Sequence, residues 1–330
     1  MKTAFVTGGS GHLGANLVRN LIKSGWNVRC LIHKDEEPFV GLNIEKVYGD
    51  LSSVSILSEQ MEGCESVFHL AAYVGIENVN IPLMKKINIL GTQNMCEAAL
   101  KCNVKRFIYF SSIHAFDQRP IHETLTEDRP LVTDPSSPLY DQTKAIAQTI
   151  VYDACKKGLN ASILHPTGVL GPFDYKPSRM GKVLMDISNR KMLIQIDAGF
   201  NWIDARDVAD TAIQCVDLGE KGKNYIVSGT WASFKEISDI VAKLINKRTS
   251  LIIFPLWIAY TAIPFAYVLS KIFGNRPSFS RGSIHALAIQ SKKISNDLAK
   301  NKLNHRVRDL EETIIAVSYT HLTLPTNREV

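Results

Sequence analysis

Residues 6–17 read VTGGSGHLGANL and join a short apolar run to a helical pattern. The stretch contains three glycines at a spacing of three residues: Gly8, Gly11 and Gly14. Such glycines permit a tight turn, let a phosphate approach the backbone closely and let the helix pack against the strand. The first helical turn, beginning at His12 and Leu13, then offers its N–H groups and the positive end of the helix dipole to the phosphates. We therefore predict a dinucleotide-binding loop here.

Working outward from this loop, apolar runs alternate with helical segments through the first half of the chain. Six runs have the composition of strands: Ala4–Thr7, Val28–Ile32, Glu45–Tyr48, Ser66–Leu70, Arg106–Phe110 and Ser162–His165. Helical spacing of apolar residues recurs between them, at residues 13–22, 54–61 and 88–100. Continuously apolar strands alternating with helices form a parallel sheet covered on both faces. The prediction is an α/β fold with a Rossmann-type doubly wound parallel sheet; a mixed α+β fold explains the alternation less well.

The end of the second strand bears on the choice of cofactor. NAD-selective sites usually place an acid there, whereas a basic residue accommodates the additional phosphate of NADP. In VRCLIHKDEE, His33 and Lys34 come before Asp35 and Glu36. The order favours NADP, although NAD is not excluded because Asp35 and Glu36 follow immediately and a shift of one residue would reverse the preference.

Composition limits the remaining classes. The chain has 330 residues, a net charge of +6 and scattered lysines and arginines, so no nucleic-acid-binding tail is expected. Six cysteines lie far apart without a CxxC pair, which indicates buried thiols in a reducing compartment and no metal site. The N-terminus runs directly into the first strand without a signal peptide. We expect a cytoplasmic protein.

Tyr140 and Lys144 lie four residues apart in PLYDQTKA, residues 138–145. Positions i and i+4 are neighbours on one helix face. The lysine can be a surface residue, or it can place a positive charge beside the phenol and lower its pKa from the usual value of about 10. The spacing alone leaves both interpretations open.

After the glycine loop, six motifs resemble, in order, the extended short-chain dehydrogenase/reductase family across roughly residues 1–315. They are YGDLSS, FHLAAYVG, FIYFSSIHAF, YDQTK, LHPTGVLGPFD and NWIDARDVAD. The resemblance implies that a set of residues contacts the cofactor, namely Asp50, Leu51, Ala71, Ala72, Pro166 and Thr167. It also assigns the catalytic positions to Ser112, Tyr140 and Lys144, with the last two also beside the cofactor.

In enzymes of this family a tyrosine transfers a proton to or from the substrate oxygen while the nicotinamide transfers hydride at carbon. The resemblance therefore implies an NAD(P)-dependent oxidoreductase acting on CH–OH groups. Lys144 would favour ionisation of Tyr140, and Ser112 would hydrogen-bond the substrate oxygen within reach of the phenol.

Three residues depart from one branch of that family. His114, Phe116 and Asp117 stand where sugar-nucleotide epimerases commonly have Thr, Tyr and Gly. The chain is more similar to the dihydroflavonol-reductase-like and 3-beta-hydroxysteroid-dehydrogenase-like branches, which favours net oxidation or reduction over epimerisation or dehydration with a recycled cofactor. A non-catalytic NADP-sensing regulator is a further alternative, but it would not need Ser112, Tyr140 and Lys144.

We expect residues 1–170 to form the cofactor-binding domain and residues 171–316 a smaller substrate-binding region interleaved with it. SFKE, residues 233–236, has the pattern of a capping box that opens a helix extending to Ile245. Residues 251–270 carry no charge and are long enough to cross a membrane, but Pro255 and Pro264 disfavour one straight helix. A buried, pocket-lining role is favoured over membrane contact, and an apolar pocket suits a small, largely apolar substrate.

Two expectations concern the surface and the end of the chain. Residues 317–326, VSYTHLTLPT, do not continue the preceding helical pattern and match the translation of a sequencing adapter, so 317–330 is expected to be a non-native tail. Two helices, at about 84–101 and 140–157, are expected to form a homodimer, because Val151 lies apart from the Ile146 and Ile150 face and could seal a partner.

Overall fold

The computed structural model describes residues 2–75, 79–189, 194–246, 252–255, 258, 261 and 290–321. Its largest element is a seven-stranded sheet of order β10-β6-β5-β4-β1-β2-β3. The strands, whose registered pairs are all parallel, are β1 Thr3–Thr7, β2 Asn27–Ile32, β3 Glu45–Tyr48, β4 Ser66–His69, β5 Arg106–Phe110, β6 Ala161–Pro166 and β10 Asn224–Val227. The six predicted strands and the doubly wound fold are confirmed, and β10 is an addition.

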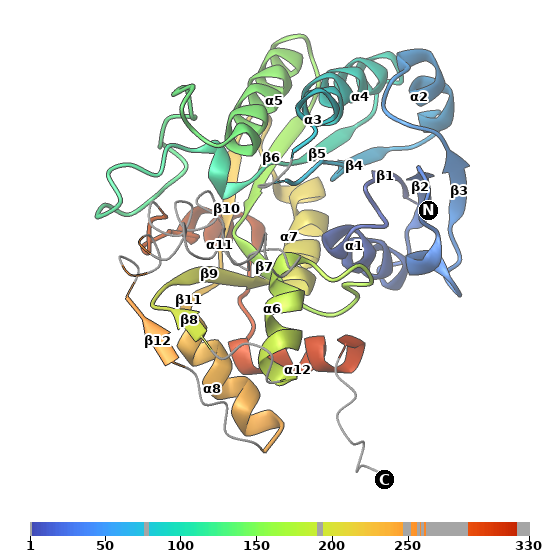
Figure 1. The fold of residues 1–330 in the computed structure, drawn as a ribbon. Helices are drawn as coiled ribbons and strands as arrows, with labels where there is room; N and C mark the ends of the chain where they lie inside the picture. Colours follow the sequence, from blue (N-terminus) through green and yellow to red (C-terminus); the bar gives the residue numbers. More distant parts are fainter. Residues whose placement is uncertain are drawn as a thin grey trace.

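Helices cover both faces of this sheet (Figure 1). One layer contains α1 His12–Lys23, α7 Ala205–Leu218 and α11 Asp297–Leu303; the other contains α2 Val54–Met61, α4 Gly91–Lys101 and α5 Leu139–Lys156. Alternate residues of one strand supply the two cores. Ala4 and Val6 of β1 pack with α1 and α7, whereas Phe5 packs with α2, α4 and α5. The period-two pattern of a strand buried on both faces explains why its sequence is continuously apolar.

The helix predicted at about 84–101 is composite. It begins with α3 Ile81–Lys85, passes through a π-helical turn, η2 Lys86–Leu90, and continues as α4. A π-helical turn adds a residue to the turn and often occurs at a functional site. Two 3-10 turns, η1 Glu37–Phe39 and η3 Ile113–Ala115, follow β2 and β5.

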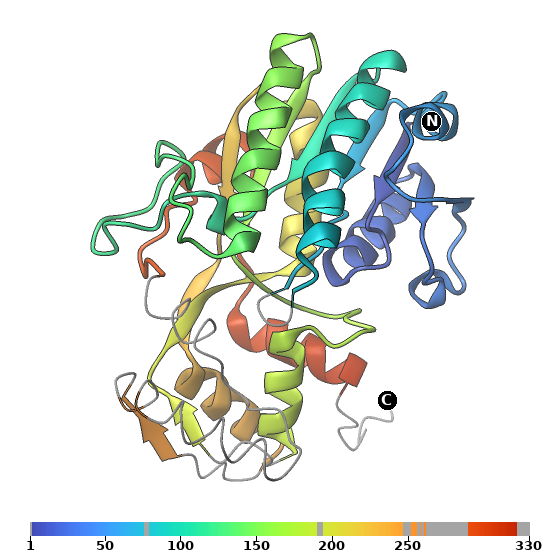
Figure 2. The ribbon, with the colours of Figure 1, turned by 45° about the horizontal axis from the view of Figure 1, so that its top comes forward.

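A smaller assembly lies beyond the carboxyl ends of the central strands (Figure 2). It contains a three-stranded sheet of β7 Gly168–Leu170, β9 Gly199–Asp204 and β11 Thr230–Ser233, and a parallel pair of β8 Ile194–Ile196 and β12 Ile252–Phe254. Its helices are α6 Arg179–Ser188, α8 Phe234–Leu244 and α12 Leu310–His321. Ser233 and Glu236 form the predicted capping box at the start of α8. The chain returns to the central sheet through α7, β10 and α11, so the two parts are interleaved.

Most of the apolar segment 251–270 lies outside the described residues. Its described portion includes β12, which pairs with β8 through Ile252, Ile253 and Phe254. Within the portion of the chain covered by the structure, no helix is both long enough and apolar enough to cross a membrane.

The C-terminal helix differs from the sequence expectation. α12 extends through His321, so the expectation that no helix continues past residue 316 is wrong. Val317 is buried in the core of the smaller assembly with Leu184 and Ile314, which explains why the helix continues there. Residues 322–330 of the expected non-native tail lie outside the described residues, and the origin of 317–330 stays a prediction.

The outer face of α5 also differs from the expectation. Val151 is fully buried in the core beneath α5, whereas Ile146 is 47% exposed. Leu90, at the end of η2, is exposed as well. The apolar side chains left exposed on the expected dimer helices therefore include Ile146 and Leu90 but not Val151, because α5 turns Val151 towards the sheet. The homodimer itself stays a prediction.

Gly8, directly after β1, lies against the backbone of the loop that follows β4. Its φ is +72°, and a Cβ on Gly8 would lie 2.6 Å from the backbone nitrogen of Ala71. Gly25, after α1, has a similar φ of +79° but nothing within 4 Å of the corresponding position. Both positions therefore disfavour a side chain on conformational grounds, but only Gly8 lacks the space for one.

The pair Gly8→Ala and Gly25→Ala tests this close approach. Each substitution should lose about 1–2 kcal/mol from left-handed strain. Gly8→Ala should lose about 1–3 kcal/mol more, because the added methyl overpacks against the backbone of Ala71. Denaturant unfolding of both variants measures the difference. Equal losses would mean that the loop can move away from β4 without cost.

Candidate active site

The predicted site residues come together at the carboxyl edge of the central sheet. In the sheet β1 lies between β2 and β4. The chain adds β2 and β3 on one side of β1 and then crosses to add β4 on the other, so the strand order reverses at β1. Ligands of doubly wound proteins bind in the crevice at such a reversal. The site residues follow the ends of six strands in spatial order: Thr167 after β6, Ser112 after β5, Ala71 after β4, Gly8 after β1, His33 after β2 and Asp50 after β3.

The N-terminus of α1 is suited to a bound pyrophosphate. Gly11 is its N-cap and supplies no side-chain hydrogen bond to the first turn, which also contains no acidic residue. By contrast, Ser53 caps α2, and Asp204 caps α7. The first N–H groups of a helix have no partner within it. In α1 they remain available to phosphate oxygens, so the residues present fit a dinucleotide.

The side chain of His12 binds the loop after β7. Its Nε2 lies 3.1 Å from the carbonyl oxygen of Gly171, and burial lowers the pKa of the imidazole. One turn later, Asn16 donates to the carbonyl of Pro172 at 2.8 Å. The two side chains hold the loop after β7 against α1. His12 can still contact a cofactor through its backbone N–H.

The adenosine end of the crevice is an open cavity of about 330 Å³ beside β2 and β3. It is lined by His33, Tyr48, Gly49, Asp50, Ser53 and Ile56. The carboxylate of Asp50 accepts hydrogen bonds from the backbone and hydroxyl of Ser52, which lower its pKa. Leu51 packs against Gly91 of α4, where a Cβ would lie 2.7 Å from the leucine side chain. Asp50 therefore lines the cavity, while the neighbouring Leu51 packs against α4.

Charges at the end of β2 are partly neutralised. His33 and Lys34 are exposed, whereas the side chain of Asp35 is 19% exposed and pairs with Lys176 at 2.6 Å. Lys176 lies in the loop between β7 and α6, far from Asp35 in the sequence. The acid nearest to the end of the strand is thus already paired, while His33 and Lys34 face solvent beside the cavity.

Ser112, Tyr140 and Lys144 come together between β5 and α5. Ser112 caps η3, and its Oγ accepts a hydrogen bond from the backbone N–H of His114 at 3.2 Å. Tyr140 lies in the first turn of α5, with the Ser112 hydroxyl close enough to lower the pKa of its phenol. Lys144 is 3% exposed and donates from Nζ to the carbonyl oxygen of Phe110 at 2.8 Å. Lys144 is therefore not a surface residue.

The protonation of this group differs from the expectation. Burial raises the pKa of Tyr140 to about 12, against the smaller lowering effect of its bond to Ser112. Burial also lowers the pKa of Lys144 to about 7. The expectation that Lys144 lowers the pKa of Tyr140 is wrong for the protein alone, because burial dominates both pKa values and Lys144 is not among the groups that shift the pKa of Tyr140. Tyr140 is accordingly a neutral phenol that can donate a proton at neutral pH.

A second titratable pair borders the same site. Asp141 follows Tyr140 on α5 and is 8% exposed; its Oδ2 lies 3.8 Å from Nδ1 of His114 in η3. Burial raises the pKa of Asp141, and the charge of His114 opposes that rise. His114 was singled out in the sequence only as a departure from the epimerases, and Asp141 was not singled out at all.

Sequence reasoning also missed Asn88, in the π-helical turn. Its amide accepts from the backbone N–H of Tyr73 at 2.7 Å and donates to Thr143 Oγ1 at 3.1 Å. Thr143 in turn donates to the carbonyl of Tyr140. Asn88 therefore joins the loop after β4 to the turn that carries Tyr140. The available signal was Asn88 with Thr92, a polar i,i+4 pair on an otherwise apolar helix face.

The remaining predicted positions lie after β6. Pro166 is buried in the strand, and the hydroxyl of Thr167 donates to Asn201 of β9 at 2.9 Å. Among the described residues no group of three His, Cys, Asp or Glu side chains could hold a metal ion. All six cysteines are free, and five of them are buried.

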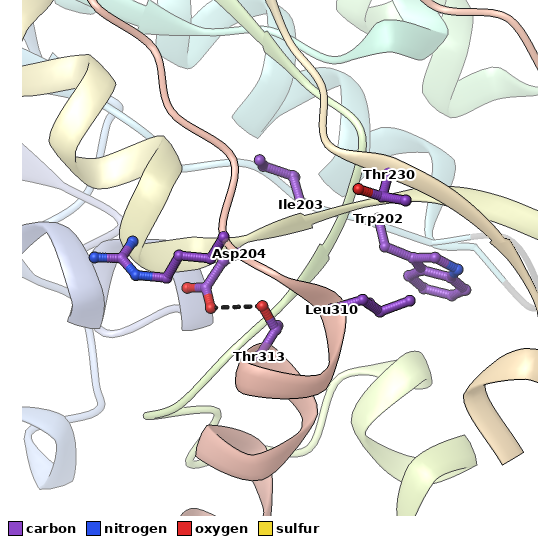
Figure 3. A pocket seen from close by; sticks show the side chains of 7 residues that line it. Trp202, Ile203, Asp204, Thr230, Leu310 and Thr313 are labelled. Atoms are coloured by element: carbon purple, nitrogen blue, oxygen red, sulfur yellow. Dashed lines mark hydrogen bonds between the residues drawn. The ribbon is translucent and has the colours of Figure 1, made fainter. Parts of the chain in front are cut away.

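A narrow pocket elsewhere belongs to the packing within the smaller assembly. It is lined by residues of β9, β11 and α12 and their flanks, and Figure 3 shows Asp204 directed at Thr313 within it. Asp204 accepts from Thr313 at 2.9 Å and also pairs with Arg206 at 2.6 Å. Its carboxylate is already engaged in capping α7, so this pocket is structural and not a binding site.

The family pattern of NAD dependent epimerase/dehydratases matches residues 4–228. The chain belongs to this family. Sterol demethylase protein B of Methylococcus capsulatus is 31% identical over 294 residues, covering 86% of this chain and 88% of that protein. A putative dihydroflavonol 4-reductase of Synechocystis is 31% identical over 283 residues, covering 83% and 81%. The crystal structure of gox2253 matches with a TM-score of 0.84 at 26% identity and covers 97% of each chain.

These similarities confirm the resemblance to the extended short-chain dehydrogenases/reductases, including their dihydroflavonol-reductase-like members. The chain is an NAD(P)-dependent oxidoreductase.

The buried ammonium of Lys144 predicts a pH-dependent stability difference. Because its folded pKa is about 7, below the ordinary 10.5, the unfolded chain binds more protons between these values and stability rises with pH. Lys144→Met removes this dependence. The free energy of unfolding of Lys144→Met relative to wild type should be greatest below about pH 7 and should decline towards pH 10. Lys157→Met, an exposed lysine near the end of the same helix, is the control. A difference that does not change with pH would mean that Lys144 is buried without electrostatic cost.

Proposed function

We propose that this enzyme interconverts a ketone or aldehyde and an alcohol on a small, largely apolar substrate, with Tyr140 as the proton donor and acceptor. The observation that carries the proposal is that Ser112, Tyr140 and the buried Lys144 lie together between β5 and α5. The Ser112 hydroxyl is close enough to lower the pKa of Tyr140, and Lys144 is fixed by its bond to the Phe110 carbonyl. The three groups lie at the carboxyl edge of the sheet, next to the loop suited to a dinucleotide.

In the reducing direction, the bound nicotinamide supplies a hydride to the carbonyl carbon. Tyr140 donates its phenolic proton to the carbonyl oxygen as the new C–H bond forms, and Ser112 donates a hydrogen bond that holds this oxygen in place. Ser112 Oγ accepts from the N–H of His114, so its own O–H is available to donate, towards the phenol of Tyr140 in the protein alone and towards the substrate oxygen in the reaction. Lys144 supplies positive charge beside the phenolate left on Tyr140. In the oxidising direction each transfer is reversed.

Exposed apolar side chains on the segment that follows β4 support an apolar substrate. Val74, two residues after Ala72, is 67% exposed, and Ile81 at the start of α3 is also exposed. Exposed apolar residues beside a reactive group favour a hydrophobic ligand. The names of two relatives, a sterol demethylase component and a dihydroflavonol reductase, point to the same class of compact, polycyclic molecules.

NADP is the proposed preferred cofactor. His33 and Lys34 are free to meet a phosphate on the adenosine ribose, and the carboxylate of Asp35, which would repel it, is paired with Lys176. The family is NAD-dependent by name, so the preference concerns this chain and its own basic residues.

Tyr140→Phe tests the catalytic assignment. A positioned acid or base contributes about 10²–10⁴ in rate, so turnover should fall by at least a hundredfold while NADPH affinity is nearly retained. NADPH consumption is followed by absorbance with a panel of ketones, aldehydes and nucleotide sugars, including phenanthrenequinone as a flat apolar dicarbonyl. Near-wild-type turnover in the variant would remove Tyr140 from its role. Conversion of a nucleotide sugar without net NADPH consumption would instead support the alternative, an epimerase or dehydratase that recycles its cofactor.

Cofactor preference is tested by Lys34→Met, with the exposed Lys101→Met as a matched control. A charge-assisted hydrogen bond contributes about 1.5–3 kcal/mol, so NADPH affinity should fall by about ten- to a hundredfold. NADH affinity should change little, because NADH lacks the phosphate. Binding is measured by quenching of protein fluorescence. Equal affinities of the wild type for the two cofactors would contradict the assignment.

A further inference from the structure

His165 lies directly behind the catalytic serine. It is the residue before Pro166 in β6, is fully buried, and stacks on Phe116 with ring centroids 4.4 Å apart. Its Nδ1 lies 3.0 Å from the backbone carbonyl oxygen of Ser112. Because a carbonyl only accepts, Nδ1 carries the proton and donates it to Ser112. This bond crosses from β6 to the loop that follows β5.

The neighbouring residue is fixed from the opposite side. Ser111 donates from its hydroxyl to Gln148 of α5 at 2.9 Å, and both side chains are buried. Gln148 lies one helical turn beyond Lys144. The loop carrying Ser112 is thus attached to α5 through Ser111 and to β6 through His165.

The two attachments belong to one buried polar network. Nε2 of His165 carries no proton when Nδ1 donates to Ser112, so its 3.3 Å approach to the Asn224 side-chain oxygen at the start of β10 is a contact and not a hydrogen bond. Gln148 donates to the same Asn224 oxygen at 3.0 Å. Tyr152 donates to it at 2.9 Å. The network encloses the backbone of residues 111 and 112 between α5, β6 and β10. Networks of this kind, when satisfied, hold their members in one arrangement.

We propose that His165 is a positioning residue that orients Ser112 towards Tyr140 and the substrate oxygen through its Nδ1 hydrogen bond to the Ser112 carbonyl. The inference rests on the proposed function, because it assumes that Ser112 holds the substrate oxygen. His165 does not touch the reacting atoms. It fixes the peptide plane after Ser112, and with it the direction from which Oγ approaches the phenol of Tyr140.

A buried histidine can also be a simple core residue, and two substitutions separate these roles. The amide nitrogen of Asn can occupy the place of Nδ1, so His165→Asn keeps the bond to Ser112. The amide of Gln reaches the place of Nε2, so His165→Gln keeps the contact with Asn224 and loses the bond to Ser112. Both variants remove the ring from Phe116, so a core role predicts similar effects from the two.

The readout is the hydrogen bond between Ser112 and Tyr140, followed by fluorine NMR of the full chain labelled with fluorotyrosine. The Tyr140 signal is identified by its absence in Tyr140→Phe, and Ser112→Ala defines its position when the bond is lost. We expect His165→Gln to move the signal most of the way to that position and His165→Asn to leave it near wild type. In the Ser112→Ala background, His165→Gln should cause no further shift, since both changes remove one interaction.

Turnover of phenanthrenequinone provides the second readout. His165→Gln should lower kcat by about tenfold or more, because small displacements of a positioning group are costly, while His165→Asn should stay within about threefold of wild type. NADPH affinity should not change in either variant. Equal signals and equal kcat losses in the two variants, tracking their loss of thermal stability, would overturn the positioning role and leave the proposed function intact. A Ser112→Ala variant that neither shifts the Tyr140 signal nor lowers kcat would overturn the proposed function and this inference together.

Discussion

The close approach of Gly8 to the backbone of Ala71 is the constraint on which the site depends. It brings the end of β1 against the end of β4 without a side chain between them, at the point where the strand order reverses. The contact is continued by a buried polar chain. Thr7 is bonded to His69 at 2.7 Å, His69 to Thr92 at 3.1 Å, and Thr92 to the carbonyl of Asn88. The glycine loop after β1 is therefore connected, through buried side chains, to η2, whose Asn88 contacts α5 one turn from Tyr140.

Burial sets the chemistry of the catalytic group. The pKa of Lys144 falls to about 7 and that of Tyr140 rises to about 12, both because their charged forms are removed from water. These shifts lower the charge of the site in the protein alone. A charged cofactor would interact strongly with these two groups, because electrostatic interactions are stronger in a low-dielectric environment than in water. The stability cost of burying Lys144 thus falls within the candidate site, and perturbed pKa values of this kind are common in active sites.

The loop after β7 joins the two parts of the molecule. Its carbonyls at Gly171 and Pro172 bind His12 and Asn16, and Arg19 of α1 donates to Tyr175 at 2.7 Å. Lys176 then reaches Asp35 beyond β2. A segment that leads into the smaller assembly thereby contacts both α1 and the residues that follow β2.

The sequence by itself determined the doubly wound sheet, because strands buried on both faces must be continuously apolar and glycine is required where β1 meets β4. It also identified Tyr140 and Lys144 as neighbours, since i and i+4 share a helix face. It could not determine which face of α5 meets the sheet, and so it assigned the exposed position to Val151 when Ile146 occupies it. Nor could it find His165 or Asn88 as parts of the site, because their partners lie 53 residues away at Ser112 and 55 residues away at Thr143. The protonation of Tyr140 was likewise decided by the tertiary structure: local spacing places a charge nearby, but only the folded chain removes the water that would otherwise stabilise the phenolate.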